Sequence, residues 1–164
     1  MSLPSGVTLR TATADDALAG AELHRACWRE AYGPHVDPEV LAERLADHER
    51  WVSAWERQLA AGPPRTLALA GDEPVGFAVA GPSRKEDAPV DLELYALYTR
   101  AAWWGRGLGA ALLDAVAPSE PCWLFVLETN VRAQAFYRRH GFEADGHGQL
   151  YAGFGTWEIR MVRG

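Results

Sequence analysis

Hydrophobic and polar residues change their spacing several times along the chain, and each change predicts a different element. Residues 7–12, VTLRTA, alternate between apolar and polar side chains, which predicts a strand with one buried face. Thr13 and Asp16 then have the spacing of a helix capping box, with aspartate in place of the usual glutamate or glutamine. The apolar residues of the following helix share one face: Leu23, Ala26, Cys27 and Ala31.

Two more helices are predicted before the chain returns to strands. Asp37 is a typical N-cap residue, and Pro38 suits the first position of a helix that runs towards Asp47. Another helix spans about residues 51–61, where the sequence AGPP ends it. The apolar runs RTLALAG and PVGFAVAG, separated by DE, then indicate a hairpin of two buried strands.

Residues 91–99, DLELYALYT, predict a further strand. Strict alternation divides it into two faces, one with Glu93, Tyr95 and Leu97 and the other with Leu92, Leu94 and Ala96. A glycine-rich stretch follows. After it, aliphatic residues recur at helical spacing and predict a helix: Leu108, Ala111, Leu112 and Ala115.

The last part of the chain combines one helix with three strands. Residues 122–128, CWLFVLE, are typical of a strand buried on both faces. Asn130 caps the next helix, and Gly141 ends it. Strands at about 143–151 and 156–162 complete the chain. This order predicts a mixed α/β (α+β) fold with a partly antiparallel sheet, and it has neither repeated βαβ units nor an eightfold repeat.

Composition narrows the class of protein. A chain of 164 residues suits one domain, which we place at residues 7–163, with residues 1–6 as a disordered leader. A net charge of −6 argues against nucleic acid or an anionic membrane as a partner. The two cysteines, Cys27 and Cys122, have no metal-ligand spacing, so we expect no metal. Neither a secretory signal nor a spanning segment is visible, which favours a cytoplasmic location.

Residues 103–113, WWGRGLGAALL, have glycine at three alternate positions between a strand and a helix. Glycines let the backbone approach a ligand closely, and a helix N-terminus favours an anion such as pyrophosphate. The spacing fits neither the dinucleotide fingerprint nor the nucleotide P-loop, because the third glycine comes too early and lysine is missing. On these residues alone, a phosphate-binding loop and a mobile turn remain equally open.

A second motif favours the interpretation of this stretch as a phosphate-binding loop. Residues 130–142, NVRAQAFYRRHGF, start directly after a buried strand and match the pattern Asn-x-x-Ala-x-x-Phe-Tyr-x-x-x-Gly-Phe. With this motif and the glycine loop, the sequence resembles the GNAT superfamily of acetyl-coenzyme A-dependent N-acetyltransferases. The family's loop pattern, Gln/Arg-x-x-Gly-x-Gly/Ala, aligns with residues 104–109, where Trp104 replaces the leading Gln or Arg. The resemblance implies a largely antiparallel sheet of about seven strands flanked by four to five helices.

The resemblance also implies roles for individual residues. Glu93 would be the base that takes a proton from the amine, with Asp91 as the fallback, and Tyr137 would act on the departing sulfur. A backbone N–H near Leu97 would polarise the thioester carbonyl. The residues that would bind acetyl-coenzyme A are Leu97, Tyr98, Thr99, Trp104, Gly105, Arg106, Gly107, Leu108, Gly109, Ala110, Asn130, Ala133, Phe136 and Tyr137.

The acceptor is expected to be a primary amine of a small molecule or peptide, attacking the thioester directly in a ternary complex without a cysteine intermediate. His24, Trp28 and Tyr32 recur at helical spacing and form either a buried helix face or part of the acceptor pocket. An alternative function is a catalytically weak, coenzyme-binding sensor or interaction module, which Trp104 motivates. The preferred acyl chain, and the choice between a monomer and a homodimer, stay open.

Overall fold

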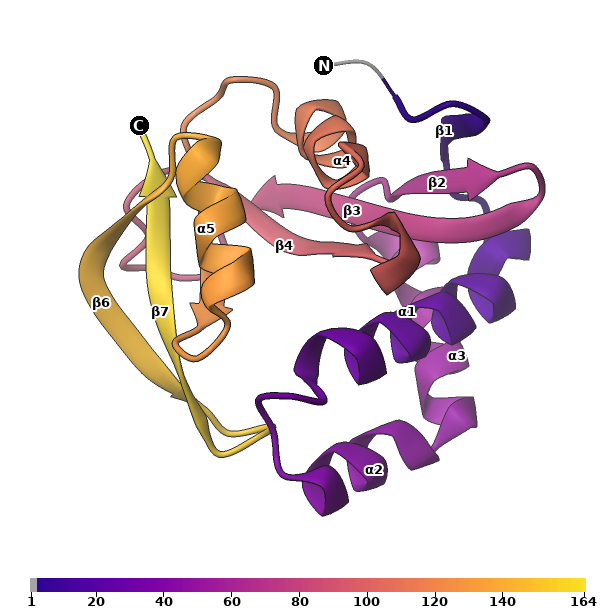
Figure 1. Cartoon of the computed structure of the whole chain (residues 1–164), viewed down its shortest axis with the longest axis horizontal. Coiled ribbons are helices and arrows are strands. Elements are labelled where there is room, and N and C mark those ends of the chain that lie inside the picture. The colour runs from indigo at the N-terminus through magenta and orange to yellow at the C-terminus, as the bar shows by residue number, and fades with distance from the viewer. Residues whose placement is uncertain (1–2) are drawn as a thin grey trace.

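The computed structural model describes residues 3–164, so residues 1–2 of the predicted leader lie outside the described part. The described residues form one sheet of seven strands in the order β1-β2-β3-β4-β5-β7-β6 (Figure 1). The strands are β1 (Val7–Thr11), β2 (Thr66–Ala70), β3 (Glu73–Pro82), β4 (Leu92–Thr99), β5 (Cys122–Leu127), β6 (Glu143–Tyr151) and β7 (Thr156–Arg163). Within this sheet only β4 and β5 pair in parallel.

Five α-helices accompany the sheet in the described residues: α1 (Ala17–Tyr32), α2 (Pro38–Ala46), α3 (His48–Ala61), α4 (Leu108–Val116) and α5 (Val131–Arg139). Two short 3-10 turns, Ala14–Asp16 and Ala101–Trp103, precede α1 and α4. The predicted mixed, largely antiparallel fold of seven strands is therefore confirmed.

Helices pack on both faces of the sheet, as Figure 1 shows for α1 and α4. Leu67 and Phe77 pack in a core cluster with residues of α1 and α3. Their chain neighbours Ala68 and Ala78 pack in another cluster with α4. Because successive strand residues point to opposite faces, α1 and α3 lie on one side of β2 and β3, and α4 lies on the other.

The helices begin at the capping residues that the sequence predicts. The Asp16 carboxylate accepts a hydrogen bond from the Thr13 backbone N–H at 2.7 Å, which is one half of the predicted capping box. Asp37 caps α2 by accepting hydrogen bonds from the backbone N–H groups of Glu39 and Val40. Asn130 caps α5 in the same way through the N–H of Ala133, at 3.1 Å.

Strands β4 and β5 diverge, and this opening positions the site. Their ladder contains a single pair, Glu93 with Trp123. In the antiparallel ladder between β3 and β4 the register shifts, so that Tyr95 is an extra residue between Leu94 and Ala96. The predicted alternation along β4 was wrong beyond this bulge, because Leu94 and Leu97 pack towards one core cluster and Ala96 towards another.

We expect Gly20→Ala to lower the free energy of unfolding by about 1–3 kcal/mol, because a small-to-large change in a packed core forces neighbours apart. An ideal Cβ on Gly20 lies 2.4 Å from two ring carbons of Trp55, which is itself buried. Urea denaturation measures the change, with Leu18→Ala on the exposed side of α1 as the control. A Gly20→Ala protein as stable as the wild type would contradict this packing.

Candidate active site

A cavity of about 950 Å³ opens where β4 and β5 diverge, and it extends to α1. Most of the residues selected from the sequence line it, including Glu93, Tyr137 and the stripe of His24, Trp28 and Tyr32. Two members of the predicted loop do not: Leu108 is fully buried in the core, and the Arg106 guanidinium lies over the Trp103 ring. The fold thus joins α1, near the start of the chain, to motifs more than 60 residues later.

The glycine loop places a helix N-terminus at this cavity. Gly105 and Gly107 have positive φ angles of 73° and 85°, which residues with a side chain rarely adopt. The hydrogen bond from the Ala111 N–H to the Gly107 carbonyl, 3.1 Å long, begins α4. The N–H groups of residues 108–110 precede that bond and have no partner inside the helix. They form a compact set of donors that favours an anion.

Gly109 has a different role from the other two glycines. It lies inside α4 and not in the loop, which corrects the prediction of three loop glycines. A Cβ on Gly109 would lie 3.3 Å from the Phe136 ring. Glycine at this position therefore lets α4 approach α5 closely, beside the cavity that both helices line.

Trp104 connects the loop to two other elements. Its indole N–H donates a hydrogen bond to the Thr99 carbonyl at the end of β4, at 3.1 Å. The Arg132 guanidinium of α5 lies over its ring, 3.6 Å from the ring centre, in a cation–π contact. Trp104 thus braces the loop and also holds a positive charge at the wall of the cavity.

Tyr137 is a buried side chain of α5 that lines the same cavity. Burial raises the pKa of its hydroxyl, and the neighbouring Tyr98 and Cys122 raise that pKa further. The hydroxyl therefore keeps its proton at neutral pH. It can donate a hydrogen bond to an anion, whereas full proton transfer from it is unfavourable.

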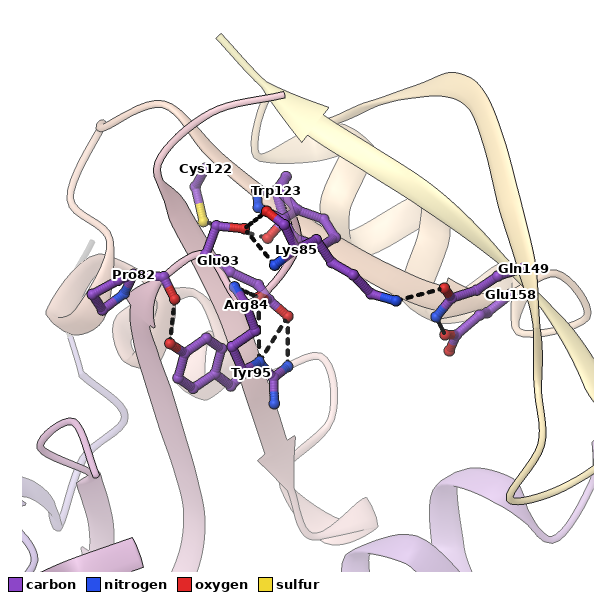
Figure 2. Close-up of polar contacts among 10 residues, drawn as sticks. Pro82, Arg84, Lys85, Glu93, Tyr95, Cys122, Trp123, Gln149 and Glu158 are labelled. Carbon is purple, nitrogen blue, oxygen red and sulfur yellow. Dashed lines mark hydrogen bonds and ion pairs between the residues drawn. The ribbon is translucent and has the colours of Figure 1, made fainter. Parts of the chain in front are cut away.

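Glu93 is already held by a cation. Both of its oxygens accept hydrogen bonds from Arg84: Oε1 from Nη2 at 2.5 Å and Oε2 from the backbone N–H at 2.9 Å (Figure 2). The same guanidinium lies over the Tyr95 ring, and the Tyr95 hydroxyl donates to the Pro82 carbonyl. The Arg84 side chain is 61% exposed, so it can move into solvent more easily than Glu93, which is 6% exposed.

Aromatic side chains form the end of the cavity that lies against α1. His24 accepts a hydrogen bond from the Trp55 indole, and burial, assisted by Arg65, lowers its pKa to about 3, so it stays neutral. Tyr32 and Tyr98 share a hydrogen bond of 2.7 Å between their hydroxyls. The stripe on α1 is therefore packed against neighbours and lines the cavity at the same time. The aromatic residues that line this end are Trp28, Tyr32, Tyr98, Tyr151 and Phe154.

Sequence reasoning missed a second carboxylate, Glu158 on β7, which also lines the cavity. The Gln149 amide donates to its Oε1 at 2.6 Å, and Lys85 donates to the Gln149 carbonyl oxygen at 3.2 Å (Figure 2). Burial raises the pKa of Glu158. The sequence held no local signal for it, because its place in the cavity follows from the pairing of β7 with β5 beside the split.

Neither cysteine belongs to the cavity lining. Burial raises the pKa of Cys27 to about 12 and that of Cys122 to about 11, so both stay protonated at neutral pH. Within residues 3–164, no cluster of three or more His, Cys, Asp or Glu side chains could hold a metal ion. No described helix is both long and apolar enough to cross a membrane.

The open edges of β4 and β5, the glycine turn before α4 and the buried Tyr137 of α5 thus line one cavity. The family model described as "Acetyltransferase (GNAT) family" matches residues 19–142. The chain therefore belongs to the GNAT acetyltransferase family, and it is an acyltransferase.

Individual relatives agree with this assignment. A Mycobacterium tuberculosis protein named as a probable N-acetyltransferase is 28% identical over 148 residues, 87% of this chain and 83% of that protein. An aminoglycoside N(6')-acetyltransferase type 1 of Stenotrophomonas maltophilia is 33% identical over 86% of this chain and 89% of the relative. The fold matches the PaiA N-acetyltransferase of Thermoplasma acidophilum, solved with coenzyme A, with a TM-score of 0.67, 18% identity and 99% coverage of both chains.

Proposed function

We propose that the protein transfers an acetyl group from acetyl-coenzyme A to a primary amine by direct attack within a ternary complex. The observation that carries the proposal is one continuous cavity, lined by the glycine loop, by aromatic residues against α1 and by two carboxylates. Tyr137 also lines this cavity. The relative named for aminoglycosides supports an amine as the acceptor.

The part of the cavity beside the glycine loop fits the pyrophosphate of acetyl-coenzyme A. The donors of residues 108–110 suit a pyrophosphate, and Arg132 and Arg139 add positive charge to the same cavity wall. Gly105 and Gly107 give the loop a shape that leaves the backbone open to the ligand, since a Cβ on Gly105 would have no atom within 4 Å. The described residues thus fit a phosphate-bearing coenzyme.

Strand β4 suits the binding of the pantetheine arm and the thioester. One edge of β4 pairs with β3 as far as Thr99, whereas its other edge pairs with β5 only at Glu93. The backbone groups on the open edge from Leu97 to Thr99 are therefore available to hydrogen-bond the arm, apart from the Thr99 carbonyl, which accepts from the Trp104 indole. One of these N–H groups would polarise the thioester carbonyl, as an oxyanion hole does. Asn130, which lines the cavity while capping α5, would add a side-chain contact.

The acceptor must lose a proton before it attacks, because an alkylammonium with a pKa of about 10.4 has no free lone pair at neutral pH. Two carboxylates of the cavity could take that proton, Glu93 and Glu158. Glu93, the base implied by the family resemblance, requires Arg84 to move away first. Glu158 requires no such movement.

Direct attack is favoured over a cysteine intermediate, because Cys27 and Cys122 are buried thiols with raised pKa values. The experiment is an initial-rate assay of thiol release from acetyl-coenzyme A with a panel of primary amines. Intersecting double-reciprocal lines are expected for a ternary complex, and parallel lines would contradict direct attack. Tight coenzyme binding without turnover of any amine would instead favour the sensor function.

We expect Trp104→Gln to change the affinity for coenzyme A by less than about fivefold. The substitution removes the stack under Arg132, and exposed cation–π contacts contribute only about 0.5–1 kcal/mol. It also removes the indole hydrogen bond to the Thr99 carbonyl, for which the glutamine amide is a replacement donor. The backbone donors at the start of α4 remain in place. Calorimetric titration with coenzyme A measures the change. A loss beyond about 50-fold would show that Trp104, and not the backbone, dominates binding.

A further inference from the structure

The charge of the cavity differs from that of the whole chain. The protein has a net charge of −6, yet the acidic side chains that line the cavity are Glu93 and Glu158. The basic side chains of the lining are Arg65, Arg84, Lys85, Arg132 and Arg139. Because Arg84 neutralises Glu93, one carboxylate remains for a cationic group of the acceptor. That carboxylate belongs to Glu158.

Glu158 has the geometry of a ligand-binding carboxylate. It sits on β7 opposite Leu127, at the end of β5 where the split is open. Gln149 holds Oε1, whereas no hydrogen bond within residues 3–164 uses Oε2 (Figure 2). Lys85, in the loop after β3, donates to Gln149, which lies between Lys85 and Glu158. Burial raises the pKa of Glu158, and the positive charge of Lys85 partly offsets that rise. One oxygen is thus fixed and the other is available.

Glu158 and Tyr137 line one cavity, and Tyr32 of α1 lines it with them. The Tyr32 hydroxyl is held by that of Tyr98, and its ring packs against those of Trp28 and Phe154. The carboxylate that could bind the amine and the tyrosine that could bind the departing sulfur therefore open into the same space.

The cavity walls beside Tyr32 are aromatic. The Phe154 ring lies 5.0 Å from that of Trp28 and 5.1 Å from those of Tyr32 and Tyr151, measured between ring centres. Such a wall buries an apolar body and attracts a cation to its ring faces. Extra positive charges on the acceptor would instead meet Arg65 and Lys85, which repel them.

We propose that Glu158 binds the ammonium group of the acceptor and takes its proton, and that the acceptor is a primary monoamine on an aromatic or aliphatic body. This inference rests on the proposed acetyl transfer, and it names the substrate class for the same site. It also separates this protein from its relative named for aminoglycosides, which are polycations.

Proton transfer to Glu158 precedes the attack of the amine on the thioester. An ammonium N–H bond breaks, its proton goes to Oε2 of Glu158, and the freed lone pair attacks the thioester carbonyl carbon. The new C–N bond forms, the C–S bond breaks, and sulfur leaves with the bonding electron pair. The second proton of the amine passes to sulfur, to which Tyr137 donates a hydrogen bond. The products are an acetamide, a free thiol and one proton on Glu158, which solvent removes.

The test compares kcat/KM for phenethylamine, spermidine and kanamycin, in the wild type and in Glu158→Gln. We expect kcat/KM of the wild type to be at least tenfold higher for phenethylamine than for spermidine or kanamycin. Glu158→Gln should lower kcat/KM for phenethylamine about 100-fold and change the KM for acetyl-coenzyme A by no more than about twofold. Glu143→Gln, an exposed carboxylate on β6, is the matched control and should change nothing. A preference for spermidine or kanamycin, or a Glu158→Gln enzyme within threefold of the wild type, would overturn the inference.

A second variant covers the case in which Glu158→Gln does not fold. Lys85→Glu adds a carboxylate to the cavity wall and should raise kcat/KM for spermidine about fivefold or more; an unchanged or lower value contradicts the inference. Calorimetry with phenethylamine in the presence of coenzyme A tests the role of Glu158 separately from the proposed acetyl transfer. Binding by the wild type but not by Glu158→Gln, without turnover, would uphold Glu158 and refute acetyl transfer. Equal binding by both proteins would overturn the role of Glu158.

Discussion

Gly107→Val is expected to lower the affinity for coenzyme A about 100-fold, equivalent to about 2.7 kcal/mol. Gly107 has φ +85° and directly precedes α4, so its conformation aims the first N–H groups of the helix. An L-residue in this region costs about 1–2 kcal/mol, and a β-branched side chain tolerates it least. The loop would relax to another conformation and the donors would lose their alignment.

Gly71→Val is the matched control for this experiment. Gly71 also has a positive φ angle, +62°, but it lies in the turn between β2 and β3 and does not line the cavity. Its replacement should destabilise the fold by a similar amount and leave coenzyme affinity within about twofold. Equal affinities of Gly107→Val and the wild type, measured by calorimetry, would refute the assignment of the loop.

Tyr137→Phe is expected to lower kcat about 100-fold, within the range of proton-donating catalytic groups. The buried hydroxyl keeps its proton because burial raises its pKa, so it supplies a hydrogen bond when negative charge develops on the leaving sulfur. Phenylalanine keeps the ring and its packing against Phe142, 5.6 Å away between ring centres. The loss should therefore appear in catalysis and not in folding.

Steady-state kinetics and calorimetry of the same Tyr137→Phe preparation distinguish these effects. The dissociation constant of coenzyme A should stay within about threefold of the wild-type value, and the thermal midpoint should change little. A kcat within twofold of the wild type would show that Tyr137 only packs in the core. A parallel loss of binding and kcat would show that it holds the coenzyme and does not assist the chemistry.

Much of the fold could be predicted because its signals are local in sequence. Asp37 and Pro38 mark a helix start through short-range hydrogen bonding and a fixed φ angle, and the structure begins α2 there. Asn130 and Gly141 bound α5 for the same reason. The glycine loop was also recognisable, because positive φ angles need glycine wherever the loop lies in the fold.

The remaining features depend on contacts between distant residues. The bulge at Tyr95 arises from the register with β3, and no periodicity within β4 reveals it. Gly109 resembles a loop glycine in sequence, whereas its role comes from the Phe136 ring of another helix. Glu158 enters the cavity because β7 pairs with β5 beside the split. Such placements follow from strand pairing, which a single sequence does not encode locally.

A crystal structure with coenzyme A bound would test the central claim most directly, because that claim is where on the protein the coenzyme binds. We predict the pantetheine arm between β4 and β5, with its polar groups on the open edge of β4 at residues 97–99. We predict the pyrophosphate against the N–H groups of residues 108–110. A coenzyme bound elsewhere, or one whose phosphates lie away from the start of α4, would contradict this account.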